Sequence, residues 1–259
     1  MNDIIYGEID DKNPSMYGIL AGICKGEIWS FKNEPLALDV MYSYCVGGCG
    51  VVGRIPDEKK RQARIFFEAV FSSLMEKNIH EFEFSAEDVD LRSAILDIFS
   101  DKELFSEEEY SYRKSNSCNF NAALPAYTFL EVDRCFLKMT DYYENVEILL
   151  ERLNNSWYEQ EDFLEQSKCF VALQGKKIVG IIFGSARFSN IIAVDIEVLE
   201  EHRKKGIATT LTAHFVNACI RMGCIVQWDC VESNVQSQAV AEKCGFQLFK
   251  KRPYYWFAL

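Results

Sequence analysis

A short basic segment ahead of a predicted helix is the part of this sequence best suited to chemistry. Arg203-Lys204-Lys205-Gly206 follows a predicted strand over residues 191–198 and precedes a predicted helix over residues 207–222. The first N–H groups of a helix have no partner within it, and the helix dipole adds partial positive charge there. Such a helix start binds phosphate, and the three basic side chains strengthen the positive field around it. The segment is therefore predicted to be an anion site.

The elements around this segment are predicted from hydrophobic spacing. Apolar residues recur at intervals of three and four along the first helix, at Ile207, Leu211, Phe215, Ala218 and Met222, which indicates one buried face. A strand is predicted over residues 225–230. A second helix begins at Asn234, a good N-cap residue, and ends at Gly245, where a helix favours a left-handed residue. Residues 246–249 and 254–258 are predicted as a final pair of strands.

The basic segment resembles the acetyl-coenzyme A loop of the GNAT acetyltransferase superfamily. The family pattern is Arg/Gln-x-x-Gly-x-Gly/Ala, which stands here as Arg203-x-x-Gly206-x-Ala208. A second family motif follows at the expected spacing, Asn-x-x-Ser-x-x-x-Ala-x-Lys-x-Gly-Phe, from Asn234 to Phe246. The resemblance covers roughly residues 133–259. It implies an α/β fold in which helices flank a mixed sheet.

Within the superfamily, the sequence is most similar to the branch that includes zwittermicin-type self-resistance acetyltransferases. Trp228-Asp229-Cys230 and Asp195-Ile196-Glu197 carry this similarity.

The resemblance also implies that acetyl-coenzyme A is the cosubstrate, and it indicates which residues would bind it. The pyrophosphate would lie on the loop and the helix start, and the preceding strand would offer backbone groups to the pantetheine arm. Asn234 and Ser237 would bind pantetheine amides or phosphates, or serve only as helix-cap residues. The predicted binding residues are Ile196, Val198, Arg203, Lys204, Lys205, Gly206, Ile207, Ala208, Asn234 and Ser237.

Two carboxylates on the strand before the loop are candidates for a general base. Acyl transfer to an amine requires a positioned thioester, removal of a proton from the amine, and protonation or stabilisation of the leaving thiolate. Strand alternation places Asp195 and Glu197 on one face, and Glu197 is the first candidate. The alternative is that the two residues form only a polar strand face.

The candidate general acid departs from the family pattern. Many members carry a tyrosine four residues before the glycine of Gly-Phe, and Ala241 occupies that position here. Tyr254 or Tyr255 on the closing strand could replace it, although buried aromatic packing is the simpler interpretation of both. Direct release of the thiolate is a third possibility. His202, in the basic loop, is expected to be solvated, and His214, on the helix, is expected to be structural.

The two halves of the chain share a pattern at an offset of 144 positions, at which Phe105 falls on Phe249 and Tyr110 on Tyr254. The sequence therefore predicts a tandem arrangement, with a degenerate acetyltransferase-like or accessory domain over residues 1–130 and a coenzyme A-binding catalytic domain over residues 131–259. The alternative is chance similarity between two α/β halves. The phosphate loop is not repeated, because Gln62 stands opposite Gly206 and its side chain would crowd a pyrophosphate.

The sequence supports several further predictions about single segments. A strand hairpin is expected around residues 33–35, and the glycine-rich segment 46–54 is interpreted as structural because it lacks the Gly-Lys-Ser/Thr ending of a nucleotide-binding loop. A boundary is expected between Ser115 and Asp133. The second half is predicted to open with a strand over residues 134–139 and a helix over residues 141–154.

Composition limits the classes of partner and location. A net charge of −11 argues against nucleic acid and is compatible with a cationic amine substrate. No apolar run approaches the ~18 residues that span a bilayer, and Met1 to Ile4 show no signal peptide, so no membrane partner is expected. The ten cysteines lie scattered in apolar segments, as in a reducing cytoplasm, and no metal site is expected. The sequence does not predict the oligomeric state.

Two functions are compatible with these features. The first is an acetyl-coenzyme A-dependent N-acetyltransferase that transfers an acetyl group to the amine of a small molecule. The second is a non-catalytic sensor or interaction module that binds acetyl-coenzyme A without turnover. The absence of the family tyrosine favours the second, whereas the basic loop and the acidic strand favour the first. The sequence does not identify the acceptor or distinguish acetyl from a longer acyl group.

Overall fold

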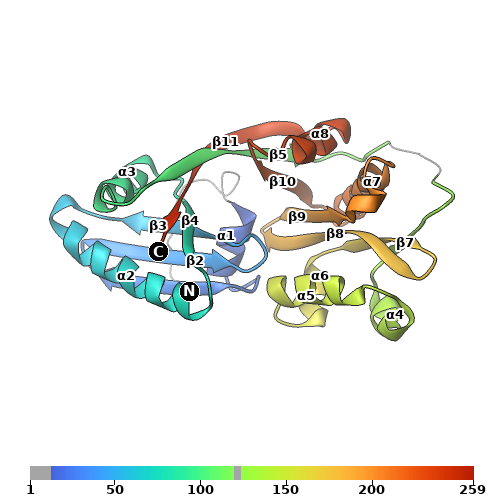
Figure 1. Ribbon diagram of the computed structural model, residues 1–259, viewed down its shortest axis with the longest axis horizontal. Coiled ribbons are helices and arrows are strands. Elements are labelled where there is room, and N and C mark those ends of the chain that lie inside the picture. Colours follow the sequence, from blue (N-terminus) through green and yellow to red (C-terminus); the bar gives the residue numbers. More distant parts are fainter. Residues whose placement is uncertain (1–12, 120–123) are drawn as a thin grey trace.

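The computed structural model describes residues 13–119 and 124–259, in which one eleven-stranded sheet runs through both halves of the chain. Figure 1 shows the sheet with helices packed against it along its length. The strand order is β1-β2-β3-β4-β11-β5-β10-β9-β8-β7-β6. Residues Met1 to Ile4, where no targeting signal is expected, and part of the predicted boundary segment lie outside the described residues.

The elements of the two halves follow the same order. In the first half they are α1 (Pro14–Leu20), β1 (Glu27–Asn33), β2 (Leu36–Ser43), β3 (Gly48–Arg54), α2 (Lys60–Glu76), β4 (Glu81–Ser85), α3 (Val89–Ile98) and β5 (Phe105–Lys114). In the second half they are β6 (Thr128–Glu131), α4 (Arg134–Leu137), α5 (Val146–Ser156), α6 (Gln160–Gln166), β7 (Cys169–Gln174), β8 (Lys177–Phe188), β9 (Ile191–Val198), α7 (Ile207–Arg221), β10 (Ile225–Val231), α8 (Val235–Lys243) and β11 (Gln247–Ala258).

The internal repeat predicted from the sequence corresponds to a structural repeat. The elements α1 to β5 recur, in order, as α6 to β11, and the predicted hairpin around residues 33–35 is formed by the antiparallel strands β1 and β2. The fold class predicted for both halves is therefore confirmed: each half has helices packed on its part of a mixed sheet.

The last strands of the two halves are exchanged. β5 of the first half pairs with β10 of the second, and β11 of the second half lies between β4 and β5. Phe257 of β11 consequently lies in the core of the first half, with ring centroids 5.2 Å from Phe99 and 5.6 Å from Phe82. Each half is therefore completed by a strand from the other, and the two halves share one sheet.

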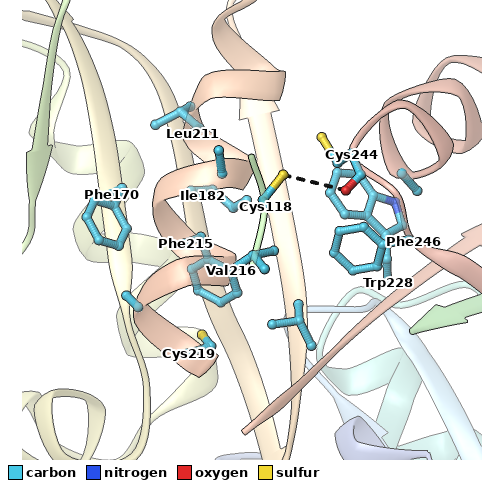
Figure 2. Close-up of a cluster of buried hydrophobic side chains, with 14 of the residues drawn as sticks. Cys118, Phe170, Ile182, Leu211, Phe215, Val216, Cys219, Trp228, Cys244 and Phe246 are labelled. Carbon is cyan, nitrogen blue, oxygen red and sulfur yellow. Dashed lines mark hydrogen bonds between the residues drawn. The ribbon is translucent and has the colours of Figure 1, made fainter. Parts of the chain in front are cut away.

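Alternation along the strands of the second half fills a core on each face of the sheet. Phe170 and Ala172 of β7 pack toward α7, whereas Cys169 and Val171 pack toward α1, α5 and α6. Figure 2 shows the first of these cores, in which α7 packs against Phe170 and Ile182, and Trp228 and Phe246 lie beside Cys244. The cores on both faces hold the strands that carry the candidate site.

The cysteines serve as small apolar residues in these cores. All ten are free, and eight are buried. Burial raises the pKa of Cys244 to about 12 and that of Cys24 to about 11, so both remain protonated thiols at neutral pH. Within the described residues, no helix is long and apolar enough to cross a membrane.

Three local predictions from the sequence are wrong. Residues 134–137 form helix α4, because the Asp133 side chain accepts a hydrogen bond from the Phe136 N–H and caps it; the opening strand is β6. The helix predicted from residue 141 begins at Val146, after a 3₁₀ turn at Thr140–Tyr142. The predicted final pair of strands is a single strand, β11, with an irregularity between Leu248 and Lys250.

The glycine-rich segment has the structural role that the sequence predicts. It forms the turn before β3 and β3 itself, and two of its glycines, Gly48 and Gly50, lie against packed side chains. A Cβ on Gly50 would lie 2.5 Å from Cγ of Met16, and a Cβ on Gly48 would lie 2.3 Å from the hydroxyl of Tyr254. Close packing therefore accounts for glycine at both positions.

Removal of the Phe257 ring tests the strand exchange. Phe257→Ala should lower the free energy of unfolding by about 3–5 kcal/mol, because it leaves a cavity among the aromatic rings of the first half. Urea unfolding followed by circular dichroism measures the change. Leu248→Ala, at an exposed position of the same strand, is the control and should cost less than about 1 kcal/mol. Equal small effects of the two variants would contradict the exchange.

Candidate functional site

The loop before α7 makes a tight turn into the start of the helix. Lys204 and Gly206 both adopt positive φ, at 60° and 87°, and turn the chain into the helix. The side chain of Arg203 donates to the carbonyl of Val198, and the ammonium of Lys205 donates to the carbonyl of Glu201 at 2.7 Å. These two hydrogen bonds fix the conformation of the turn, so the free N–H groups at the start of α7 point toward the same side of the loop. Gly206 meets the requirement for positive φ without a side chain.

A cleft of about 570 Å³ opens at this loop. Its volume is within the range of small-molecule and cofactor sites. Nine of the ten predicted binding residues line it, namely Ile196, Val198, Arg203, Lys204, Gly206, Ile207, Ala208, Asn234 and Ser237. Lys205 is outside this lining, because its side chain is bound to Glu201 within the loop. The structure thus brings together residues from β9, the loop, α7 and α8.

The separation of two strands opens the cleft. β10 pairs in parallel with β9 over a short register, Ile225 to Gln227 opposite Ile191 to Ala193. Beyond that register the two strands are no longer paired, and residues Ile196 to Val198 of β9 line the cleft. Because α7 and α8 follow β9 and β10, the starts of both helices are directed to the same opening.

Asn234 and Ser237 have structural partners as well as a place in the cleft. The Asn234 side chain accepts from the N–H of Ser237 and caps α8. The hydroxyl of Ser237 accepts from Nε1 of Trp228 at 2.8 Å. The helix-cap interpretation is therefore confirmed for Asn234, and both residues remain exposed to the cleft.

Several lining residues are absent from the sequence-based set. His202, Thr209, Trp228, Gln236, Ala239, Val240 and Lys243 also line the cleft. His202 is buried, with Nδ1 3.1 Å from the Tyr127 hydroxyl, so the prediction that it is solvated is wrong. Tyr127 is distant in sequence from the loop, and no local signal reveals this contact. Trp228 is part of a noted motif, but only the fold directs it to the cleft. His214 stacks on Phe129 and Phe170, as expected for a structural residue.

The carboxylates Asp195 and Glu197 lie on the same face of β9, and both form ion pairs with Arg152 of α5. Burial raises the pKa of Asp195, although the guanidinium of Arg152 acts in the opposite direction. Glu197 lines the cleft, whereas Asp195 lines a second cavity. Arg152 could not be identified from the sequence, because it lies on a helix 43 residues before Asp195 and belongs to no motif.

The third catalytic candidate, Tyr254, is separated from the loop. Its hydroxyl donates to Oε2 of Glu83 at 3.0 Å, and it lines the second cavity rather than the cleft. Burial raises its pKa, so the hydroxyl is protonated at neutral pH. Ala241, at the position of the family tyrosine, is fully buried.

The second cavity, of about 230 Å³, lies between the two halves. Asn13, Ser15, Met16, Cys45, Val46, Ser85 and Glu109 line it from the first half, and Ser185, Ala193, Val194, Asp195, Asp229 and Tyr254 line it from the second. It therefore adjoins the cleft where β9 and β10 diverge, because both openings are lined by consecutive residues of these two strands.

The first half has a counterpart of the cleft with different chemistry. A cavity of about 630 Å³ is lined by residues that correspond at the 144-residue offset, including Lys60, Asp90 and Ser93, which stand opposite Lys204, Asn234 and Ser237. Lys60 is bound to Asp57 at 2.7 Å and to Asp97 at 2.9 Å. The acidic residues at this position oppose the binding of an anion.

The comparisons with known proteins agree with this geometry. A family model described as GNAT acetyltransferase matches residues 10–255. A Bacillus subtilis protein described as the uncharacterized N-acetyltransferase YdfB is 29% identical over 108 residues, which are 40% of this chain and 41% of that relative. The chain thus matches about two fifths of the length of this curated relative.

Solved structures show the same fold at low identity. A GCN5-related N-acetyltransferase-like protein from Streptococcus suis superposes with a TM-score of 0.64 at 18% identity, covering 90% of this chain and 88% of that one. A tandem GNAT protein from the clavulanic acid biosynthesis pathway superposes with a TM-score of 0.58 at 12% identity, covering 97% and 89%. Together with the match of the family model along nearly the whole chain, the cleft and its loop lead to one conclusion. The chain belongs to the GNAT acetyltransferase family.

Proposed function

We propose that this protein transfers an acetyl group from acetyl-coenzyme A to the amine of a small molecule. The observation that carries the proposal is the cleft at the start of α7, where Gly206, two basic residues and the edge of β9 converge. The family supports acyl transfer in general. The donor and the acceptor class are inferences from the chemistry of the two adjoining cavities.

Successive parts of the cleft match successive parts of the coenzyme A molecule. The N–H groups at the start of α7, with Arg203 and Lys204 nearby, would hold the diphosphate. The pantetheine arm has amide groups that need backbone partners, and β9 offers its edge from Ile196 to Val198 where β10 has diverged. An acetyl thioester bound in this way would have its carbonyl at the junction of the cleft and the second cavity.

Positioning would supply much of the rate in a direct transfer. The amine nitrogen forms a bond to the acyl carbon, the carbon–sulfur bond breaks, the amine loses a proton and the thiolate gains one. Glu197 is our candidate for accepting the proton, because it lines the cleft, and Arg152 would orient it together with Asp195. Tyr254 is a poor candidate for the acid, since its proton is directed to Glu83. The thiolate would be released without the help of a tyrosine, which agrees with Ala241 at the position of the family tyrosine.

The second candidate function is a non-catalytic acetyl-coenzyme A sensor or interaction module. Two observations favour it: Ala241 replaces the family tyrosine, and the guanidinium of Arg152 engages both strand carboxylates in ion pairs. Thiol release from acetyl-coenzyme A across a panel of amines separates the two functions. Tight binding without turnover on any amine would support the sensor.

We further propose a division of the chain into a degenerate half, residues 1–130, and a catalytic half, residues 131–259. The acidic residues in the cavity of the first half support the absence of a coenzyme A site there. Ten free cysteines support a cytoplasmic location. The proposed branch within the family, that of the zwittermicin-resistance acetyltransferases, rests on the short motifs that contain Trp228 and Asp195.

Substitution of Gly206 tests the loop. Gly206→Trp should weaken acetyl-coenzyme A binding at least about 100-fold, or about 2.7 kcal/mol, because a side chain at this position occupies the place of the diphosphate. Isothermal titration calorimetry measures the affinity. Gly223→Trp, at the other end of α7, is the control: its φ of 75° imposes similar backbone strain with open space around it. Equal affinities of the two variants would refute the assignment.

Substitution of Glu197 tests the base. Glu197→Gln should lower kcat about 100-fold or more on an amine that the wild type acetylates, with acetyl-coenzyme A affinity changed by less than about threefold. Glu200→Gln, an exposed carboxylate after β9, is the control and should leave both values unchanged. A large loss of cofactor affinity in Glu197→Gln, with kcat retained, would assign this residue to binding instead.

The stoichiometry of binding tests the degenerate half. Calorimetry of the intact chain should give one acetyl-coenzyme A per chain, because Lys60 is neutralised by Asp57 and Asp97 and no loop glycine stands at the start of α2. The Gly206→Trp variant should then bind none. A second site that remains in this variant would show that the first half also binds the nucleotide.

A further inference from the structure

The described residues in and around the second cavity carry more negative than positive charge. The buried Arg252 guanidinium contacts Glu109 at 2.8 Å, Glu87 at 3.2 Å and Asp229 at 3.2 Å. Lys250 lies 3.9 Å from Glu87 and balances part of this charge. On the other wall, Arg152 forms ion pairs with both Asp195 and Glu197. Among residues 13–119 and 124–259, five carboxylates thus share three cations, and such an excess is costly away from water.

Glu109 is the carboxylate with unused binding capacity. Its Oε2 atom forms an ion pair with Nε of Arg252, but neither of these buried atoms has a hydrogen-bond partner among the described residues. Glu109 also lines the cavity. Burial raises its pKa to about 7, as expected for a carboxyl group that only partly shares a counterion. A cationic group placed in the cavity would supply the missing donor and the missing charge.

The second cavity lies next to the cleft. Ala193, Val194 and Asp195 line the cavity, and the next residues of β9 line the cleft. On β10, Asp229 lines the cavity and Trp228 the cleft. A molecule in the cavity would therefore lie beyond the end of an acyl thioester in the cleft.

We propose that this cavity binds the acceptor and that Glu109, with Asp229, recognises a positively charged group of it. The inference rests on the proposed function and specifies its substrate class, a small aliphatic diamine or polyamine. One amine would be held as an ammonium ion by Glu109, and another would be presented to the thioester. The volume of about 230 Å³ lies below the range of drug-sized sites, which restricts the acceptor to small molecules.

The proposal assigns a function to the first half of the chain. Glu109 belongs to β5, the strand exchanged from the first half, and Val46 and Ser85 form part of the same wall. The half without a predicted nucleotide site would then determine which amine is accepted.

The affinity for the ammonium group should depend on pH. The charged and titratable groups that face Glu109 are Arg252 and Tyr254 of β11, Asp229 of β10 and Glu87 after β4, with Cys45 and Asp195 across the cavity. Below about pH 7 Glu109 is protonated and neutral, and above it the carboxylate is available, so binding of a diamine should strengthen from pH 6 to pH 8.

The test compares 1,4-diaminobutane with 1-aminobutane on protein saturated with coenzyme A. Calorimetry should show the diamine binding at least about ten-fold more tightly than the monoamine at pH 8. Glu109→Gln should remove this preference and its pH dependence. Thiol release from acetyl-coenzyme A, measured with the same two amines, should show the same order of kcat/KM. Glu108→Gln, on the opposite face of β5, is the matched control and should behave as the wild type.

A second variant covers the case in which Glu109→Gln fails to fold. Val46→Trp adds a ring at the rim of the cavity, at a position that is 46% exposed, and leaves every charge in place. It should abolish diamine binding with acetyl-coenzyme A affinity unchanged. Failure of the diamine to bind the wild type, absence of a preference over the monoamine, or diamine binding unaffected by both variants would each overturn the proposal. Loss of acetyl-coenzyme A binding by the wild type would instead overturn the proposed function.

Discussion

The exchange of β5 and β11 is the constraint on which the remaining structure depends. Because the last strand of each half pairs within the other half, the protein has one sheet rather than two adjacent ones. The exchange buries Phe257 in the first half and Glu109 and Arg252 beside β10. It also fixes the relative position of the halves through backbone hydrogen bonds, which are less tolerant of sliding than side-chain contacts. The second cavity is lined by residues of both halves, so it keeps a defined shape only if the halves are fixed relative to each other.

The second structural feature is the divergence of β9 from β10. A strand edge without a partner would ordinarily be a defect, since its N–H and C=O groups need hydrogen bonds. Here the open edge borders the cleft, and the adjacent helix starts present further N–H groups to it. One local loss of pairing thus accompanies both the cleft and, beyond it, the cavity between the halves. The packed cores on both faces, under α7 and under α1, α5 and α6, hold the strands apart.

The charged residues around the divergence are arranged in two groups, each centred on a guanidinium. Arg152 aligns Asp195 and Glu197 on one side, and Arg252 gathers Glu87, Glu109 and Asp229 on the other. The ion pairs of Arg252 are buried and those of Arg152 are partly buried. Burial limits the net stability that such pairs contribute, because desolvation offsets the attraction. Their presence at the junction of two cavities is therefore better explained by the chemistry of a ligand than by the stability of the fold. The internal repeat supports this view. In the corresponding cavity of the first half, Asp57 and Asp97 neutralise Lys60, the lysine at the helix start that lines the cavity.

The sequence by itself determined the elements with strong local signals. The turn before α7 could be predicted because a glycine suited to positive φ and a helix start lie within six residues from Arg203 to Ala208. Helix α7 could be predicted because its apolar stripe is long and regular. The internal repeat was visible through its aromatic spacing. Local signals failed where a short segment was ambiguous, as in α4, where the Asp133 cap outweighed an apolar pattern resembling a strand.

Only the tertiary structure decided the pairing of elements distant in sequence. It separated Tyr254 from the cleft, buried His202 against Tyr127, and brought Arg152 to the strand carboxylates. It also placed Glu109 beside Asp229, which requires the strand exchange. The physical reason is that strand pairing and ion pairing depend on the packing of whole faces, whereas a sequence pattern records only the preference of each segment.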